Sequence, residues 1–224
     1  IMSNLASVYG YNGIPNSLVN HIEIVKGPNS TLYGTEAMAG VINVRTKDPA
    51  DMPLISANSY YTTHNEWNTD LSVSPDITEK VHTTISANYF RNQKQYDFNN
   101  DNFMDIVLNN RLSLFNKWEF DLKNDRKANI AARYYKESRL GGTMPFEHPL
   151  RGSDSIYGES IKTERFTILG NYDLPIANQD VRLDFSYSKH KQDSYYGTEY
   201  YKAKQSTLFA NLIWSKKLGD HNLL

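Results

Sequence analysis

The feature that most constrains this 224-residue chain is a two-residue alternation of apolar and polar side chains that recurs after residue 54. It is clearest at 181–188, where Val181, Leu183, Phe185 and Tyr187 alternate with polar residues. Successive side chains of a β-strand point to opposite faces, so the pattern predicts a strand between an apolar and an aqueous environment. No stretch of comparable length has the period of a long helix.

The same alternation occurs in seven further segments. The residues expected on their apolar faces are Ile55, Ala57, Ser59 and Tyr61; Trp67, Thr69, Leu71 and Val73; Val81, Thr83, Ile85, Ala87 and Tyr89; Leu112, Leu114, Trp118 and Phe120; Ile130, Ala132 and Tyr134; Phe166, Ile168, Gly170 and Tyr172; and Leu208, Ala210, Leu212 and Trp214. No run approaches the roughly 18 apolar residues of a membrane helix. Alternating segments of about 9 to 11 residues are typical of the tilted strands of a transmembrane β-barrel.

The connections between these segments alternate in length. Short ones are expected at 74–80, 121–127, 175–180 and 219–222, and longer ones at 92–107, 138–162 and 189–205, after a tight first loop at 64–66. Outer-membrane barrels have short periplasmic turns and long external loops. We therefore expect the long loops at one end of the sheet, on the side where a ligand arrives.

Aromatic side chains are sorted to the ends of the predicted strands. Those beside the long loops are Tyr60, Tyr61, Trp67, Tyr89, Tyr134 and Tyr187, and those beside the short turns are Trp118, Phe120, Tyr172 and Trp214. Two aromatic girdles are the expected arrangement at two membrane interfaces. A general preference of aromatic residues for strands would enrich them without sorting them.

Composition excludes several classes of function. The formal net charge of −1 offers no clustered basic face for nucleic acid. The absence of cysteine removes disulfide scaffolds, thiolate zinc sites and cysteine nucleophiles. The motifs of serine hydrolases, zinc proteases, phosphate loops and dinucleotide sites are missing as well. We therefore expect no enzymatic activity and no catalytic residues.

A different pattern precedes the alternating segments. A β-rich run at 22–25 ends at Gly27-Pro28, because proline cannot donate to a strand ladder. A capped helical turn is expected at 29–34, followed by a second β-rich run at 41–44. Two prolines in the next segment favour an extended connector. The expected organisation is a first domain at 1–48, a connector at 49–53 and a strand domain at 54–224.

Three sub-motifs in this first region, Ile-Glu-Ile-Val-Lys-Gly-Pro, Leu-Tyr-Gly and Gly-Val-Ile-Asn-Val, carry a family resemblance. In this order and spacing they resemble the C-terminal half of the plug domain of TonB-dependent outer-membrane receptors. The residues that carry the motif are Ile22, Glu23, Gly27, Pro28, Leu32, Tyr33, Gly34, Gly40, Val41, Ile42 and Asn43. An ordinary β-turn-β unit would explain the strands and breakers but not the ordered set.

The resemblance implies an all-β fold, namely a partial transmembrane antiparallel β-barrel preceded by part of a small α+β plug domain. The segments would supply about 8 of some 22 strands. The chain is short for a complete receptor and starts without an initiator methionine or a leader, so we expect a fragment of a longer protein.

By the same resemblance, the protein would lie in the outer membrane of a Gram-negative bacterium and contact its lipid. It would import a scarce, bulky nutrient such as a ferric siderophore, haem or cobalamin. The TonB–ExbB–ExbD complex would supply energy through an N-terminal box that this sequence does not contain. The alternatives are a passive porin or adhesin-type barrel and a soluble β-rich carbohydrate-binding module.

The candidate ligand-binding residues lie in the long connections, because binding side chains concentrate on loops held by a rigid scaffold. The segment 139–151 combines glycines, prolines, aromatic side chains and charges, and the tyrosines at 195–201 could stack on an anionic aromatic iron chelate. The tyrosines could equally extend a girdle. The candidates are Arg139, Met144, Phe146, His148, Tyr195, Tyr196, Tyr200 and Tyr201.

One loop carries closely spaced carboxylates. Asp97, Asp101 and Asp105 could wrap a hard cation such as calcium, although the loop lacks the glycine and glutamate of an EF-hand. A solvated acidic loop is the alternative. The resemblance adds support, because cobalamin receptors of this family hold calcium in an early extracellular loop. No other cofactor is expected.

Overall fold

The computed structural model describes residues 14–28, 37, 40–176, 179–218 and 221–223. The described chain forms a small two-stranded sheet, a large sheet and three single-turn 3₁₀ segments. No helix in these residues is both long and apolar enough to cross a membrane.

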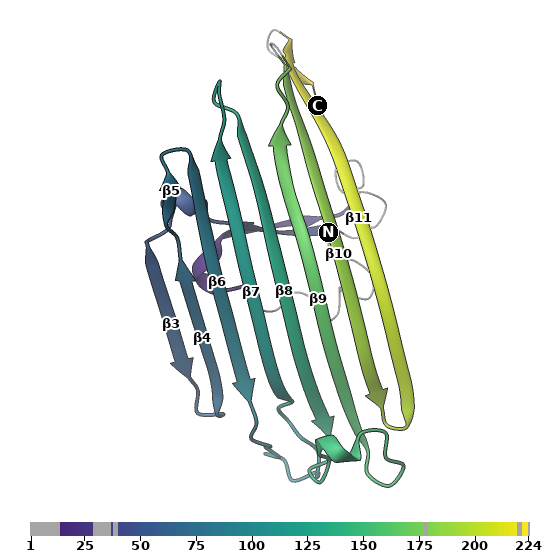
Figure 1. Ribbon diagram of the computed structural model, residues 1–224. Helices are drawn as coiled ribbons and strands as arrows, with labels where there is room; N and C mark the ends of the chain where they lie inside the picture. The colour runs from purple at the N-terminus through teal and green to yellow at the C-terminus, as the bar shows by residue number, and fades with distance from the viewer. Residues whose placement is uncertain (1–13, 29–36, 38–39, 177–178, 219–220, 224) are drawn as a thin grey trace.

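The large sheet is an antiparallel meander in which strands that follow one another in sequence are neighbours in space (Figure 1). Its order is β12-β11-β10-β9-β8-β7-β6-β4-β3, with β5 paired to β6. The strands are β3 (Ile55–Tyr61), β4 (Glu66–Val73), β5 (Asp76–Thr78), β6 (Val81–Asn92), β7 (Leu108–Asp121), β8 (Lys127–Gly142), β9 (Gly158–Asp173), β10 (Asp180–Tyr196), β11 (Glu199–Leu218) and β12 (His221–Leu223). All eight predicted segments form strands, which confirms the all-β prediction.

The strand register confirms the predicted apolar face. Leu114 pairs with Tyr134, which pairs with Phe166, so these side chains share one face across three strands. On this face Leu71 is 53% exposed and Leu212 is 62% exposed, whereas Asp70 on the opposite face is 3% exposed. A sheet that exposes its large apolar side chains and buries its polar ones is the reverse of an ordinary soluble sheet.

The small sheet consists of β1 (Val19–Lys26) and β2 (Gly40–Thr46), which pair antiparallel. Gly40 has a φ of +139°, and a Cβ there would lie 2.5 Å from the carbonyl oxygen of Val25, so only glycine fits. Asn43 donates to the Glu23 carboxylate at 2.8 Å across the two strands. The predicted helical turn and its residues Leu32, Tyr33 and Gly34 lie outside the described residues.

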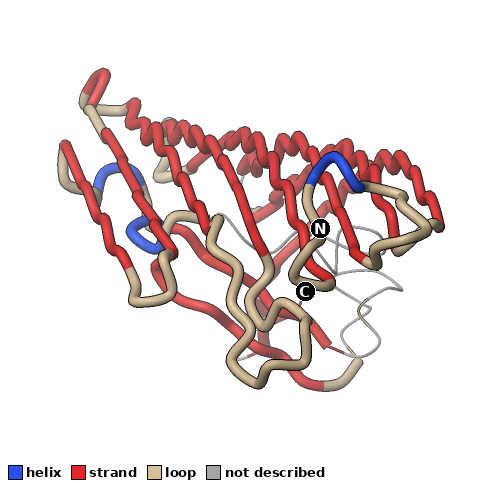
Figure 2. The backbone as a smooth tube through the Cα atoms, turned by 90° about the horizontal axis from the view of Figure 1, so that it is seen from below, coloured by secondary structure: helices blue, strands red, loops and turns tan. Residues whose placement is uncertain are grey.

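The N-terminal segment covers the polar face of the large sheet, on one side of it (Figure 2). The segment contains η1 (Asn16–Leu18) and η2 (Pro49–Asp51) in addition to the small sheet. Ser17 Oγ lies 3.4 Å from Ser72 Oγ on the polar face of β4, and η2 packs against β6 and β7. This unit is referred to below as the N-terminal unit, residues 14–52.

Three predictions about strand ends are wrong. The expected long loop at 189–205 is a pair of strands joined by a tight turn at 197–198, with Gly197 at a φ of +60°. The residues at 189–205 are mostly polar, but the two strands stay paired through backbone hydrogen bonds beyond the apolar zone. As a result β11 is 20 residues long. Tyr60, expected in a girdle, pairs with Asn68 and therefore lies on the polar face. Tyr134 and Tyr187, expected in the same girdle, lie near the middle of β8 and β10 and not at their loop ends.

Candidate ligand site at the loop end of the sheet

Two connections gather at one end of the large sheet, the lower end in Figure 1. They are the β6–β7 loop at 93–107 and the β8–β9 loop at 143–157, which contains η3 (His148–Leu150). The Met104 N–H donates to the Gly142 carbonyl at 2.8 Å, and the Met144 N–H donates to the Asn102 carbonyl at 2.9 Å. Segments about 40 residues apart in sequence are thereby joined into one structure.

A small apolar core stabilises these joined loops. Met104, Leu140 and Phe146 are almost fully buried, and the side chains packed around them are Leu108, Met144, Leu150 and Ile156. Gly158 makes room for the Phe146 ring, since a Cβ there would lie 2.0 Å from a ring atom. Fully burying a side chain of this size stabilises by about 1.5–3 kcal/mol. The loops therefore form an ordered cap and not two separate flexible connections.

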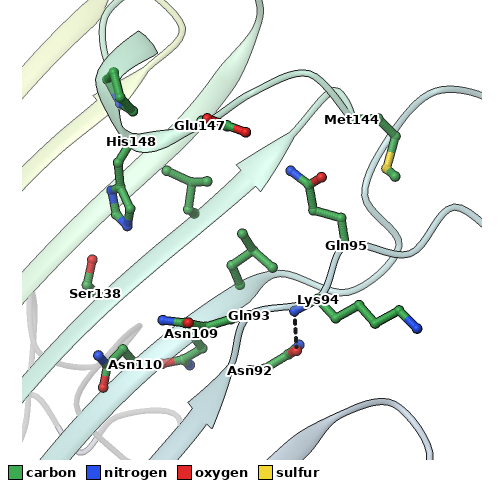
Figure 3. A pocket seen from close by; sticks show the side chains of 13 residues that line it. Asn92, Gln93, Lys94, Gln95, Asn109, Asn110, Ser138, Met144, Glu147 and His148 are labelled. Atoms are coloured by element: carbon green, nitrogen blue, oxygen red, sulfur yellow. Dashed lines mark hydrogen bonds between the residues drawn. The ribbon is translucent and has the colours of Figure 1, made fainter.

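A cavity of about 770 Å³ lies between this cap and the ends of β6, β7 and β8 (Figure 3). It is lined by Asn92, Gln93, Lys94, Gln95, Leu108, Asn109, Asn110, Ser138, Leu140, Met144, Glu147, His148 and Pro149. Its volume is in the range of small-molecule sites. The lining combines apolar surface with amide donors and acceptors, a lysine, a histidine and one carboxylate, Glu147. Its lysine, histidine and amide donors suit a polar ligand that carries negative charge.

Several cavity side chains are held in place by hydrogen bonds. Asn92 Nδ2 donates to the Val107 carbonyl at 3.2 Å, and Asn109 Nδ2 donates to Glu137 Oε1 at 3.0 Å. Gln95 Nε2 donates to the Phe146 carbonyl at 3.3 Å, which connects the two loops across the cavity. At the end of the β8–β9 loop, Tyr157 donates to Glu159 at 2.9 Å, and this bond to the neutral phenol raises the Tyr157 pKa.

The predicted ligand-binding residues fall into three groups. Met144 and His148 line the cavity. Phe146 is 1% exposed and belongs to the loop core, and Arg139 Nε lies 3.0 Å from Glu137 Oε2. Tyr195, Tyr196, Tyr200 and Tyr201 lie at the β10–β11 end and not in this cavity. Their part in ligand binding stays a prediction.

The tyrosines at the β10–β11 end are engaged in local contacts. The Tyr195 ring lies 4.8 Å from the Tyr200 ring, and the Arg151 guanidinium lies over Tyr195 at 4.8 Å. Arg151 also forms an ion pair with Asp193. These contacts attach the β8–β9 loop to the neighbouring hairpin.

Sequence reasoning missed the amide side of the cavity, Asn92 to Gln95 and Asn109. A run of amide residues directly after a predicted strand was the available signal. Which of them face the cavity depends on how the two loops pack, and that packing has no local sequence pattern.

The acidic loop uses its carboxylates to stabilise its own backbone. Asp97 accepts from the backbone N–H of Asn102 at 2.9 Å, Asp101 from Phe103 at 2.8 Å, and Asp105 from Phe98 at 2.6 Å. Within the described part of the chain, no three His, Asp or Glu side chains lie close enough together to hold a metal ion. The three aspartates are therefore not assembled into a cation site here, and calcium binding stays a prediction.

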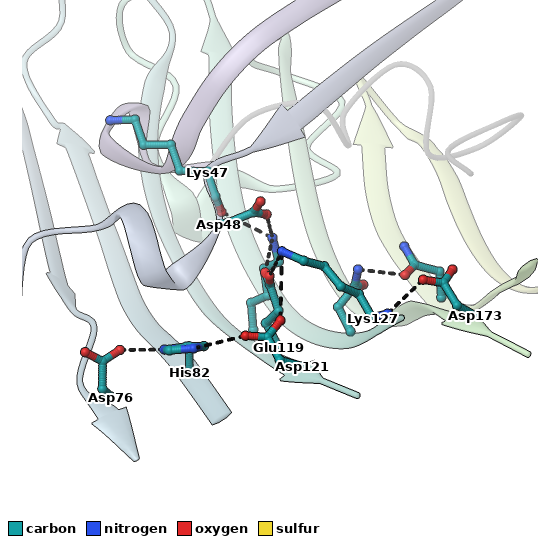
Figure 4. Close-up of polar contacts among 11 residues, drawn as sticks. Lys47, Asp48, Asp76, His82, Glu119, Asp121, Lys127 and Asp173 are labelled. Carbon is teal, nitrogen blue, oxygen red and sulfur yellow. Dashed lines mark hydrogen bonds and ion pairs between the residues drawn. The ribbon is translucent and has the colours of Figure 1, made fainter. Parts of the chain in front are cut away.

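The opposite end of the sheet carries a network of charges that ties it to the N-terminal unit (Figure 4). Lys117 Nζ lies 3.0 Å from Asp48 Oδ1 and donates to the Lys47 carbonyl at 3.2 Å. Burial alone would raise the Asp48 pKa, but the hydrogen bond and positive charge of Lys117 outweigh it, so the pKa is lowered. Lys127 pairs with Glu119 at 2.9 Å beside this contact.

Comparison with known proteins gives one family match and several fold matches. Residues 1–41 match the model of the TonB-dependent Receptor Plug Domain. The ferric-catecholate import receptor Fiu from E. coli K12, in its open form, matches at 16% identity and a TM-score of 0.58, over 92% of this chain and 38% of that one. Its closed form matches at 17% identity and a TM-score of 0.54, over 89% of this chain and 32% of that one.

The siderophore receptor PiuA from Acinetobacter baumannii matches at 15% identity and a TM-score of 0.63, over 90% of this chain and 33% of that one. The chain thus spans about a third of the length of these structures. At such identities the likeness shows the fold. The plug-domain family matches residues 1–41, and the described strands share the fold of these receptors.

Proposed function

We propose that this chain is part of a TonB-dependent transporter of the Gram-negative outer membrane that binds a ferric siderophore-type chelate at its loop end. The observation that carries the proposal is the arrangement of the two faces of the large sheet. One face is apolar and exposed, and the other is polar and covered by the N-terminal unit, whose sequence matches the plug-domain family in part. This is the arrangement expected when lipid lies outside and a plug lies inside a barrel.

The two alternatives fit these faces less well. A soluble carbohydrate-binding module would bury the apolar face in a core, because exposed apolar patches of this extent are rare on soluble monomers. A passive porin would leave its polar face to a water-filled channel. Here Ser17 and Asp48 of the N-terminal unit contact that face instead.

The cavity at the loop end supports an anionic chelate as the ligand class. Lys94 and His148 supply donors beside five amide side chains, and the apolar surface of Leu140 and Met144 can contact an aromatic part of a ligand. The relatives Fiu and PiuA are described as a ferric-catecholate import receptor and a siderophore receptor. Haem and cobalamin are the competing ligands to be tested.

The division of the chain supports a plug fixed at its C-terminal end. We place the plug at 1–48, the connector at 49–53 and the barrel wall at 54–224, since Lys117 holds Asp48 at the end of the plug and η2 of the connector packs against β6 and β7. Energy would come from the TonB–ExbB–ExbD complex through the N-terminal part of the plug. Force on that part would rearrange the plug while the connector stays attached. No catalytic step is proposed.

The test is a binding titration with the full-length receptor in detergent, using a ferric catecholate, haem and cobalamin, each with and without a calcium chelator. We expect the ferric catecholate to bind most tightly, and His148→Ala with Lys94→Gln to weaken it by at least about tenfold, because loss of even one charged hydrogen bond costs roughly 1.5–3 kcal/mol. Lys123→Gln, at the opposite end, is the matched control. Equal binding by the double variant would remove the cavity from the proposal, and preference for cobalamin would change the ligand class.

A further inference from the structure

Arg151 joins the β8–β9 loop to two strands of the sheet. Its Nε donates to Ser160 Oγ on β9 at 3.0 Å, and its Nη2 donates to the main-chain carbonyl of Asp193 on β10 at 2.8 Å. The same nitrogen forms an ion pair with the Asp193 carboxylate. The guanidinium also lies over the Tyr195 ring, at 4.8 Å. One side chain of the loop therefore connects it to both β9 and β10.

The groups that receive Arg151 are held by their own neighbours. The second oxygen of the Asp193 carboxylate accepts from the Tyr200 hydroxyl at 3.0 Å, and the Tyr200 ring packs against Tyr195 at 4.8 Å. The next loop residue, Gly152, has a φ of +80°, and a Cβ there would lie 2.6 Å from the Tyr195 ring, so only glycine lets the loop approach this closely. The set named the Arg151 cluster below consists of Arg151, Ser160, Asp193, Tyr195 and Tyr200.

Arginine suits this cluster better than lysine. The planar guanidinium can donate in several fixed directions and stack on an aromatic ring at the same time, whereas an ammonium group is a single point of charge. In the cluster it reaches a hydroxyl, a carbonyl and a carboxylate and also covers a ring. The arrangement therefore uses the shape of the guanidinium as well as its charge.

The Arg151 cluster directly follows η3, the turn that carries part of the cavity wall. Glu147, His148 and Pro149 line the cavity. η3 is a single 3₁₀ turn without a side-chain hydrogen bond at its N-cap, and the Arg151 N–H closes it by donating to the His148 carbonyl at 3.4 Å. A turn this short gains too little from its own hydrogen bonds to be stable alone. Its place therefore depends on its attachments to the rest of the chain.

η3 has two such attachments, and they differ in kind. Leu150 packs against the buried core of the joined loops. This apolar contact is not directional, so it does not fix the orientation of the turn. The hydrogen bonds and ion pair of Arg151 are charge-assisted and require a defined geometry. The Arg151 cluster therefore sets the orientation that Leu150 leaves open.

We propose that Arg151 is a positioning residue of the ligand cavity, which holds η3 to β9 and β10 and thereby sets the place of His148 relative to the ligand. The inference rests on the proposed function, because that proposal assigns the cavity to a ligand. Arg151 itself lies outside the lining of the cavity, and its Nε and Nη2 are engaged in the Arg151 cluster. A change at Arg151 acts on affinity through the turn.

The test measures the affinity of the full-length receptor in detergent for a ferric catecholate. Arg151→Ala should weaken binding about tenfold, because His148 would no longer be held within hydrogen-bonding reach of the ligand. Asp193→Asn keeps the size of the side chain but removes its charge, and should weaken binding about threefold. Arg182→Ala is the matched control. It breaks another arginine–aspartate pair of β10, to Asp184 at 2.7 Å, but at the far end of the strand, and should bind within twofold of the native receptor.

The His148→Ala background separates positioning from other roles of Arg151. Residues that act through one another have non-additive effects. Arg151→Ala should therefore weaken binding less than about threefold in a receptor that already lacks this imidazole. A full tenfold effect in that background would overturn the positioning role. Arg151→Lys retains the charge but not the planar fork, so its affinity should lie between those of the native receptor and Arg151→Ala.

Hydrogen exchange of the ligand-free receptor reports on the turn itself. The N–H groups of Leu150 and Arg151 donate to the Glu147 and His148 carbonyls within η3. Arg151→Ala should speed exchange of residue 150 at least about threefold, whereas exchange in β9 and β10 should keep its native rate and so show that the variant is folded. Native exchange in η3 together with native affinity would overturn the proposal.

The outcomes distinguish this inference from the proposed function. Tight binding of the ferric catecholate by both the native receptor and Arg151→Ala would overturn the role of Arg151 and leave the proposed function in place. A native receptor that prefers haem or cobalamin would remove the proposed ligand class. A tenfold loss of that other ligand in Arg151→Ala would still support the positioning role.

Discussion

The two faces of the large sheet are made by the same strands but are stabilised in opposite ways. The apolar face has few partners within the described chain, so its side chains remain exposed. The polar face buries residues such as Asn88, which donates to Asn68 and Asp70 at 2.8 and 2.7 Å. Buried polar groups need such partners, whereas an apolar face needs only an apolar environment. The proposed function accounts for this difference, because it places lipid outside the sheet and the N-terminal unit inside it.

Neighbouring residues on opposite faces give the largest expected contrast. Ile168 lies on the apolar face of β9 and Leu169 on the polar face. Ile168→Arg in the full-length receptor should destabilise the folded barrel by about 2–4 kcal/mol, because the charge would enter the hydrocarbon. Leu169→Arg should cost less than about 1 kcal/mol, since its side chain is 43% exposed on the inner side.

Urea unfolding in lipid vesicles, followed by tryptophan fluorescence, measures both variants. Equal destabilisation by the two arginines would contradict the assignment of the faces.

A smaller effect is expected where the polar face holds the N-terminal unit. Lys117→Met removes the contacts to Asp48 and the Lys47 carbonyl and leaves buried Glu119 with Lys127 alone. We expect attachment of the connector to weaken by about 1–2 kcal/mol. Hydrogen exchange of the full-length receptor should show faster exchange in η2, where the Asp51 N–H donates to the Asp48 carbonyl. Lys123→Met is the control, and unchanged exchange in η2 would show that Lys117 does not hold the connector.

Acidification should produce the smallest change at the same contact. The folded-state pKa of Asp48 is lowered, so its contribution is fully present above the ordinary carboxyl pKa of about 3.9 and is lost as pH falls through the lowered value. The Asp48 side chain is half exposed, so the effect should stay below about 1 kcal/mol. The η2 exchange rate, corrected for intrinsic pH dependence, should rise below about pH 4 in the native receptor. Asp48→Asn should exchange faster at neutral pH and lose this dependence.

The strands and their faces were predictable because a period of two residues is a local signal. The prediction failed at 189–205, where the paired strands extend beyond the apolar zone and consist mostly of polar residues, so that their composition resembles that of a loop. The cavity was only partly predictable. Met144 and His148 came from loop composition, but Asn92 and Gln95 depend on loop packing. The Lys117–Asp48 contact joins positions 69 residues apart, for which one sequence gives no signal.

The most direct test of the central account is a spin-label scan of residues 166, 168, 169 and 171 in the full-length receptor in lipid vesicles. This chain contains no cysteine, so each introduced cysteine can be labelled on its own within it. The account predicts that labels at 166 and 168 collide mainly with oxygen dissolved in lipid, and labels at 169 and 171 mainly with a water-soluble nickel complex. Access of the nickel complex to all four positions would contradict a lipid-facing sheet.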